Sequence, residues 1–350
     1  MQSKRTVAIL LIALYNCRTY NFSVVEKMNP KVELLEDIPS VELGEGPHWD
    51  VDTQSLFFVD IFGHSIHKYT PSTKKHSKAI IDLHKTSPDD KYDKINMVSL
   101  IVPIKGEKDK FIVSVDRELL IVTWDGIAEK PSNYQKLYEV DNERTELLTN
   151  RFNDGKCDPS GRIWAGTMGE ERVNGQPVRG RGSLYSFENK TVTKRLGQIG
   201  ISNGLAWNEE LKKMYYIDTF KVCVEEYDFD IRTGNMSNGK PIFDLDKNKI
   251  GGFPDGMAID TDGNLWVAVF NGYKVIKIDP RKPETLLTSI PIPAKQVTSV
   301  AFGGANLDEL YVTSARFAID GVVLPPPQHG GVYRVTGLGV KGYPGDAAVL

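Results

Sequence analysis

Six short runs of the chain share one pattern, in which an aliphatic or polar residue precedes an aromatic residue and small or β-branched residues follow. The runs are Leu56–Val59, Lys110–Val113, Ile163–Gly166, Met214–Ile217, Leu265–Ala268 and Leu310–Thr313. Their aromatic residues stand at positions 57, 111, 164, 215, 266 and 311, at intervals of 54, 53, 51, 51 and 45 residues. A steady period of about this length is typical of propeller blades or of a solenoid.

The content of each unit decides between these two architectures. The fourth unit predicts short strands separated by turns at Asn208–Leu211 and Thr233–Asn235. Its strands are Gly204–Trp207, Met214–Asp218, Val222–Asp230 and Pro241–Phe243. The fifth unit repeats the arrangement with Met257–Ile259, Leu265–Phe270 and Lys274–Ile278. Four antiparallel strands in each repeat form a propeller blade, and no long amphipathic helical pattern follows the N-terminal segment to favour an α/β fold.

The sequence therefore predicts an all-β fold, a six-bladed β-propeller of four-stranded antiparallel blades, with residues 28–350 as a single propeller. We expect the segment Val32–Leu35 to pair with the C-terminal blade and close the ring, which removes an exposed edge. Two polar stretches, His84–Asp93 and Phe317–Gly330, are typical of loops rather than of domain boundaries.

The N-terminal residues 1–27 predict a signal peptide or an N-terminal extension. Lys4 and Arg5 precede the apolar run Val7–Tyr15, as in a secretory signal. This run is too short to cross a bilayer, which takes about 20 residues. We expect secretion, or a cytoplasmic protein if translation starts at Met28.

Composition narrows the partners and the ligands. The 350 residues carry a formal net charge of -3 without a Lys/Arg block, which argues against nucleic acid as a partner. The three cysteines include no CxxC pair and the six histidines no HExxH spacing, so a bound metal would have oxygen ligands. Cys157 and Cys223 fall in different blades, so we expect buried free thiols. We also expect a monomer without a membrane span.

Polar residues recur just before the predicted first strand of each unit, the position that should face the propeller axis. These positions are Glu45, Val98–Ser99, Asn153–Asp154, Asn203, Asp255 and Thr298–Ser299. Four of the six have an acidic or amide side chain at or next to a glycine. Asn-Gly and Asp-Gly are also the commonest turn signals, so each position alone indicates no more than a turn.

Taken together, these positions predict a metal site at the axis. The carboxylates of Glu45 and Asp255 would converge there with the amide oxygens of Asn153 and Asn203. Two adjacent buried carboxylates repel each other, so the site needs a cation or a proton. Oxygen ligands suit Ca²⁺, Mg²⁺ or Mn²⁺, and Zn²⁺ also accepts them.

Three other motifs are better explained by structure than by chemistry. Gly200–Gly204 matches GxSxG, but an inner strand rather than a helix is predicted after it. The segments that begin at Asp158 and Asp260 have their glycine at position 4 instead of 6, so they predict hairpin turns rather than calcium loops. Gly180–Gly182 lacks the third glycine of a dinucleotide-binding motif.

Several ordered motifs resemble the senescence marker protein/gluconolactonase family, which includes regucalcin and the insect luciferin-regenerating enzyme. The motifs are Gly44–Trp49, Asn150–Lys156, Ala165–Met168, Ser202–Leu205 and Pro254–Met257. The C-terminal segments Val297–Gly304 and Tyr333–Gly342 are similar to the animal branch of the family, insects included. The resemblance extends from about Val32 to about Gly345.

The resemblance implies a six-bladed propeller with one divalent cation (Ca²⁺, Zn²⁺, Mn²⁺ or Mg²⁺) at the axis. By this resemblance the metal ligands are Glu45, Asn203 and Asp255, and Asp255 is also the proton acceptor in catalysis. The same resemblance makes Arg151, Asn153 and Glu171 the substrate contacts.

These implications predict a metal-dependent lactonase whose partner is a small sugar lactone. In this reaction the cation polarises the lactone carbonyl and Asp255 activates water. Two alternatives use the same ligands: a calcium-binding regulatory protein without important turnover, and a hydrolase acting on a luciferin-related heterocycle or an organophosphate. The loops over the site select the substrate, and the sequence does not determine it.

Overall fold

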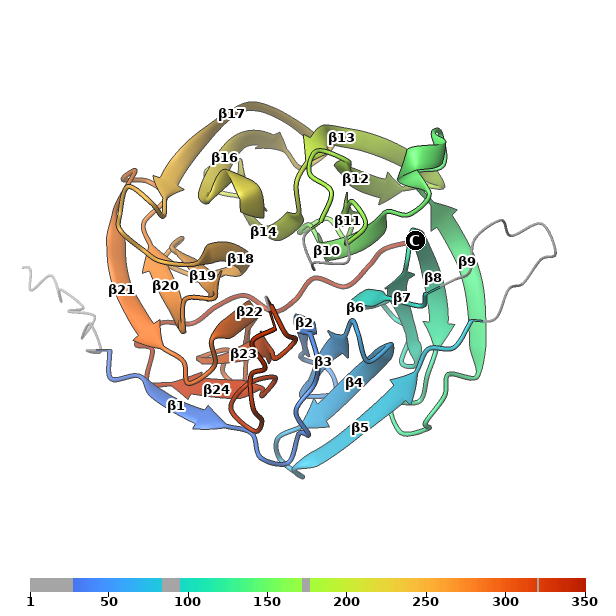
Figure 1. Ribbon diagram of the computed structural model, residues 1–350, viewed down its shortest axis with the longest axis horizontal. Helices are drawn as coiled ribbons and strands as arrows, with labels where there is room; N and C mark the ends of the chain where they lie inside the picture. Colours follow the sequence, from blue (N-terminus) through green and yellow to red (C-terminus); the bar gives the residue numbers. More distant parts are fainter. Residues whose placement is uncertain (1–27, 84–94, 172–176, 320) are drawn as a thin grey trace, which may run out of the picture.

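The computed structural model describes residues 28–83, 95–171, 177–319 and 321–350. Six four-stranded antiparallel sheets stand around a central axis as the blades of a propeller (Figure 1), which confirms the predicted fold class. The predicted signal peptide within residues 1–27 and the excursion His84–Asp93 lie outside the described residues.

Each blade places one strand next to the axis and three further strands progressively outward. The inner strands are β2 (Gly44–Asp50), β6 (Val98–Pro103), β10 (Arg151–Cys157), β14 (Ser202–Asn208), β18 (Phe253–Ile259) and β22 (Gln296–Gly303). The second strands are β3 (Ser55–Asp60), β7 (Lys110–Val115), β11 (Ile163–Met168), β15 (Lys213–Asp218), β19 (Leu265–Phe270) and β23 (Glu309–Ala315). The third strands are β4 (Ser65–Thr70), β8 (Glu118–Thr123), β12 (Gly182–Glu188), β16 (Cys223–Asp230), β20 (Lys274–Ile278) and β24 (Tyr333–Thr336). The outer strands are β5 (Lys75–Ile80), β9 (Asn133–Glu139), β13 (Thr191–Ile199), β17 (Asn235–Asp244), β21 (Leu286–Pro291) and β1 (Lys31–Leu34).

The N-terminal strand closes the ring, as the sequence predicted. β1 is the outer strand of the sixth blade and pairs antiparallel with β24, from Lys31 opposite Thr336 to Leu34 opposite Tyr333. The last blade is thus completed by the first strand, and this pairing holds the two ends of the propeller together. Two 3₁₀ turns, η1 (Thr145–Leu147) and η2 (Thr219–Lys221), interrupt the connections between strands.

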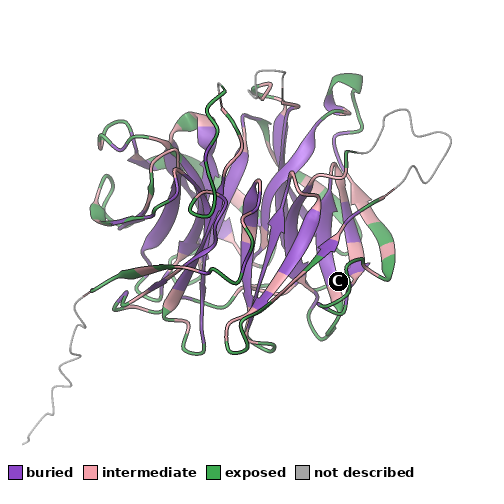
Figure 2. Ribbon diagram, turned by 60° about the horizontal axis from the view of Figure 1, so that its bottom comes forward, coloured by how far each residue is buried: buried purple, intermediate pink, exposed green. Residues whose placement is uncertain are grey.

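The hydrophobic core consists of layers between neighbouring blades. The six aromatic residues that revealed the repeat all lie on second strands and are at most 3% exposed. Among the described residues, the buried apolar side chains form six clusters, and each one joins two adjacent blades. Figure 2 shows the buried strands in the interior and the exposed connections at the two faces. The repeat period therefore reflects one buried aromatic residue on the second strand of each blade.

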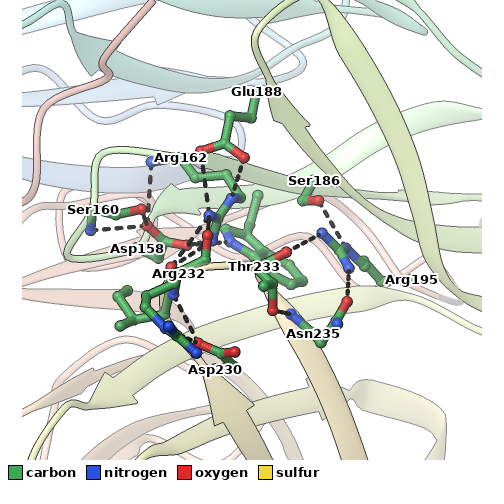
Figure 3. Close-up of polar contacts among 12 residues, drawn as sticks. Asp158, Ser160, Arg162, Ser186, Glu188, Arg195, Asp230, Arg232, Thr233 and Asn235 are labelled. Carbon is green, nitrogen blue, oxygen red and sulfur yellow. Dashed lines mark hydrogen bonds and ion pairs between the residues drawn. The ribbon is translucent and has the colours of Figure 1, made fainter.

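The two aspartates that open the calcium-like segments have structural partners, as expected for hairpin turns. Asp158 accepts a hydrogen bond from the indole of Trp164, and Asp260 accepts one from that of Trp266, both at 2.9 Å. Arg162 pairs with Asp158 at 2.8 Å and reaches the carbonyl groups of the next blade's turn (Figure 3). These carboxylates connect turns to blades.

The outer strand of the fourth blade differs most from its predicted bounds. The outer strand β17 begins at Asn235, where the sequence predicted a turn, and runs through six largely polar residues before the predicted start at Pro241. It lies at the edge of its blade with only its last residues buried, so its sequence has no apolar alternation to reveal it. Gly239 within it lies against the ring of Tyr227, where a Cβ would come within 2.3 Å.

The interpretations of the GxSxG motif and of the cysteines agree with the described structure. Ser202 of the GxSxG motif lies in β14 with its hydroxyl bonded to Tyr216 at 2.8 Å, and a strand follows it. Cys157 and Cys223 are free and buried. Within the described ranges, no helix has the length and apolar character needed to cross a membrane.

Candidate functional site

The inner strand of every blade breaks register with its neighbour near its start. The breaks lie between Glu45 and His48, Val98 and Ile101, Phe152 and Asp154, Ser202 and Leu205, Pro254 and Met257, and Val297 and Ser299. We predicted the inward residues just before the inner strands, and this was wrong: they lie within the strands, because each strand begins ahead of its break. Such β-bulges turn side chains out of the pleat, and here they turn them toward the axis.

Two glycines allow these bulges. Gly46 has a φ of +55°, a left-handed conformation that a residue with a Cβ rarely adopts, and its amide donates to the Glu45 carboxylate at 2.9 Å. Gly204 lies directly against the neighbouring inner strand, where a Cβ would come within 2.7 Å of the Asp255 carbonyl oxygen. The backbones that present Asn203 and Asp255 are therefore in contact.

Glu45 and Asp255 form a buried carboxyl pair contributed by the first and fifth blades. Their exposed fractions are 3% and 6%. Burial, followed by the charges of Glu45 and Asp154, raises the pKa of Asp255 well above its usual range. Burial and Asp154 likewise raise the pKa of Glu45, and a hydrogen bond from Asp255 partly opposes that rise. Each carboxyl group therefore disfavours ionisation of the other, and the pair needs a cation or a proton.

Asp154 is a third carboxyl group at the axis, and it was not among the predicted site residues. It is 5% exposed, and its pKa is raised by burial, an effect that Lys156 and the Gly155 amide oppose. The available signal was its position beside Asn153 before a glycine, the same signal that identified Asp255. Bulges in two further blades contribute hydroxyls that bind neighbouring backbone instead: Ser99 donates to the Phe152 carbonyl and Thr298 to that of Gly44, both at 2.6 Å.

A continuous chain of hydrogen bonds joins the predicted substrate contacts to a predicted ligand. Arg151 pairs with Glu171 at 2.8 Å and donates to the Asn153 amide oxygen at 3.0 Å. The Asn153 amide nitrogen donates to Asn203 Oδ1 at 3.3 Å. Arg151 and Asn153 are buried, whereas the Glu171 side chain is 24% exposed, so the chain leads from a more exposed rim to the axis.

The site offers unsatisfied groups of both kinds. Oδ1 of Asp255 is a buried acceptor without a hydrogen-bond partner, and Nε of Arg151 is a buried donor without one. Buried polar atoms are normally paired, so both atoms are available to bind a ligand. Among the residues that the structure describes, no three His, Cys, Asp or Glu side chains form a metal-binding group. The proposed set has two carboxylates, and an amide supplies its third oxygen.

The structure thus brings Glu45, Asn153, Asn203 and Asp255 together at the axis and links Arg151 and Glu171 to them. Oxygen atoms dominate the set, and two of its members are carboxyl groups. This donor chemistry fits a hard divalent cation such as Ca²⁺, Mg²⁺ or Mn²⁺, and it also permits Zn²⁺.

Comparison with known proteins gives consistent matches over most of the chain. Regucalcin from Bos taurus is 37% identical over 303 residues, which cover 86% of this chain and 93% of the relative. A solved luciferin-regenerating enzyme is 45% identical with a TM-score of 0.83, covering 92% of this chain and 100% of that one. A calcium-binding regucalcin from Agrobacterium tumefaciens is 26% identical with a TM-score of 0.75, covering 91% and 97%.

Residues 43–316 match the family described as the SMP-30/gluconolactonase/LRE-like region. The match contains all six predicted site residues and nearly the whole ring of blades. Together with the relatives above, it confirms the resemblance stated from the sequence motifs. This chain belongs to the SMP-30/gluconolactonase/LRE-like family.

Proposed function

We propose that this protein hydrolyses sugar lactones with the help of one divalent cation held by Glu45, Asn203 and Asp255. The observation that carries the proposal is the buried Glu45–Asp255 pair, in which Asp255 Oδ1 lacks a partner. Burying two carboxyl groups side by side is costly unless a ligand repays the cost, because each disfavours ionisation of the other. A purely structural ring has no need for such a pair.

The chemistry follows from the groups at the axis. A divalent cation in this site would polarise the lactone carbonyl and lower the pKa of a water molecule beside it. Asp255 accepts the proton of the attacking water as general base. The water oxygen bonds to the carbonyl carbon, the ring C–O bond breaks, and the same proton returns to the departing alkoxide. No covalent enzyme intermediate is required.

Substrate binding falls to Arg151, Asn153 and Glu171. The unpartnered Nε of Arg151 is a charged donor for a sugar hydroxyl or ring oxygen. Glu171, held by Arg151 at 2.8 Å and partly exposed, accepts hydrogen bonds from hydroxyl groups. Asn153 stands between them and the axis, so a lactone bound by these groups would present its carbonyl toward Asp255.

The test is a lactone panel assayed with metal-free protein and after addition of Ca²⁺, Zn²⁺, Mn²⁺ or Mg²⁺. We expect turnover of a gluconolactone that a chelator abolishes and a cation restores. Asp255→Asn should lose turnover by at least about 100-fold, since removal of a general base typically costs that much. An active, chelator-resistant Asp255→Ala variant would refute the mechanism.

A second candidate is a calcium-binding regulatory protein, supported by the similarity to bovine regucalcin and to a calcium-binding regucalcin from Agrobacterium tumefaciens. It requires the same ligands without important turnover. Calcium binding by the wild-type protein, abolished by Glu45→Gln, together with no hydrolysis across the panel, would favour this candidate. A third candidate, a hydrolase acting on a luciferin-related compound, follows from the 45% identity with a luciferin-regenerating enzyme and would show activity on such a substrate instead.

A further inference from the structure

Lys156 connects three blades by hydrogen bonds near the candidate cation site. Its side chain leaves β10 and its ammonium donates to the carbonyl oxygen of Leu205 in β14 at 3.2 Å and to that of Met257 in β18 at 2.7 Å. Leu205 lies two residues after Asn203, and Met257 lies two residues after Asp255. The contact therefore links the two strands that present predicted metal ligands.

The inner strands need such a partner because each is the edge of its sheet. A blade's sheet ends at its inner strand, so the carbonyl groups on the axial side have no neighbouring strand to bond. The ammonium has three donors, and two of them satisfy carbonyls on different blades. An apolar side chain would leave both acceptors unsatisfied.

Two carboxyl groups stabilise the charge of Lys156 against its burial. They are Asp154, next to Asn153, and Asp346 of the C-terminal tail. The tail crosses the middle of the ring, as Figure 1 shows, and is held by backbone hydrogen bonds from Ala348 and Val349 to neighbouring blades. Lys156, His48 and Asp346 line a cavity of about 680 Å³ between the tail and the inner strands.

We propose that Lys156 is a positioning residue that sets the spacing between Asn203 and Asp255, and with it the affinity of the axis for a divalent cation. The inference rests on the proposed function, because it assumes that these two residues share a cation. It assigns Lys156 no contact with the substrate. Its two hydrogen bonds hold Leu205 and Met257, the residues at which pairing with the second strand resumes after each bulge.

The charge of Lys156 and its positioning role predict opposite effects on cation affinity when the residue is replaced. As a charge alone, the ammonium repels a bound cation, so its removal would strengthen cation binding. As a positioning group, its removal frees two inner strands and misplaces their ligands, which weakens binding. Loss of groups that orient ligands typically costs about 10- to 100-fold in metal affinity. The sign of the change therefore identifies the role.

The experiment compares wild-type protein with Lys156→Met and Lys156→Arg by calorimetric titration with Ca²⁺ and with Mn²⁺. We expect Lys156→Met to bind each cation about 10- to 100-fold more weakly. Lys156→Arg, which keeps the charge and several donors, should recover most of the affinity and provides the test if the Met variant does not fold. With saturating cation, Lys156→Met should lower kcat for the lactone and leave KM near its wild-type value.

Lys277→Met is the matched control. Lys277 is a buried lysine on β20, the third strand of the fifth blade, 7% exposed and paired with Asp260 at 2.8 Å. We expect it to lower stability without changing cation affinity. Unchanged or tighter binding by Lys156→Met would overturn the positioning role alone. If the wild-type protein binds no divalent cation, the proposed function is refuted, and this inference, which depends on it, is refuted as well.

Discussion

The side-chain amide of Asn203 donates to the Thr219 hydroxyl at 2.7 Å, and that hydroxyl in turn donates to the carbonyl of Pro254 at 3.0 Å. These two bonds orient the Asn203 amide so that Oδ1, the atom able to bind a cation, faces Asn153 and the axis. They also tie η2 to the residue before Asp255. Thr219 thus connects two predicted ligands without being one.

Thr219→Val removes both hydrogen bonds while keeping the shape of the side chain. We expect divalent cation binding to weaken by about 10- to 100-fold, because outer groups that orient a ligand have effects of this size. A titration of metal-free protein with Ca²⁺ measures this affinity. Thr219→Ser keeps the hydroxyl and should bind nearly as tightly as wild type; equal affinities for the Val and wild-type proteins would contradict the role.

The fold could be read from the sequence because each blade repeats one packing problem. Phe57, Trp164 and Trp266 stand at matching places on second strands, and each fills a layer between two blades. A buried aromatic residue on the second strand of every blade leaves a period in the sequence. Strand β17 left no such signal, since its first residues face solvent and only Ile242 and Phe243 are buried.

The site was only partly predictable for a different physical reason. Glycine-adjacent carboxylates and amides marked Glu45 and Asp255, and the bulges explain why those residues point inward. The supporting groups carry no local pattern: Thr219 follows a second strand, and Lys156 resembles any strand lysine. Their roles depend on carbonyl and amide partners from other blades, which are far away in the chain.

Gly204 brings the strand of Asn203 close against the backbone of the strand that carries Asp255. A Cβ there would lie 2.7 Å from the Asp255 carbonyl oxygen and 2.9 Å from the Met257 amide nitrogen, neither of which can turn away. We expect Gly204→Ala to destabilise the protein by about 1–3 kcal/mol, as overpacking does, and to weaken cation binding. Urea unfolding and calorimetric titration measure the two effects.

Gly197→Ala is the matched control for this substitution. Gly197 lies in β13, and a Cβ there would meet nothing within 4 Å. We expect a neutral result or a gain of up to about 1 kcal/mol, because alanine restricts the unfolded chain. If both variants behave alike, the close approach at Gly204 has no part in holding the site.

Glu45→Gln should reverse its effect on stability when a cation is added. In metal-free protein it removes a buried acidic group whose pKa burial and Asp154 raise, so stability should stay level or increase. With cation at 100 times its dissociation constant, the unfolding free energy of the wild-type protein rises by about 2.7 kcal/mol, and that of the variant rises much less. Thermal unfolding with a chelator and with Ca²⁺ checks both arms.

Glu226→Gln controls for the loss of a buried carboxylate elsewhere. Glu226 is 8% exposed and pairs with Lys213 at 3.1 Å in the fourth blade. Its effect on stability should be the same with chelator and with Ca²⁺. If Glu45→Gln shows no dependence on the cation either, Glu45 does not bind it.

The C-terminal tail should make stability depend on pH through Asp346. Burial, followed by the charges of Asp158 and Glu209, raises its pKa to about 7, although Lys156 and Lys105 oppose the rise. Because the folded pKa lies above the unfolded one, the stabilisation is complete below about pH 4 and is lost as pH rises toward 7. A pKa shift of this size limits the loss of unfolding free energy to about 4 kcal/mol.

Asp346→Asn removes this titration, so its unfolding free energy should fall less than that of wild type between pH 4 and pH 8. Glu45 and Asp255 also have raised pKa values and add a slope of the same sign to both proteins, so the difference between the two curves isolates Asp346. Urea unfolding at several pH values, with chelator present throughout, gives both curves. Parallel curves would show that Asp346 ionises in the folded protein as it does in the unfolded chain, and that the tail does not hold it in a buried environment.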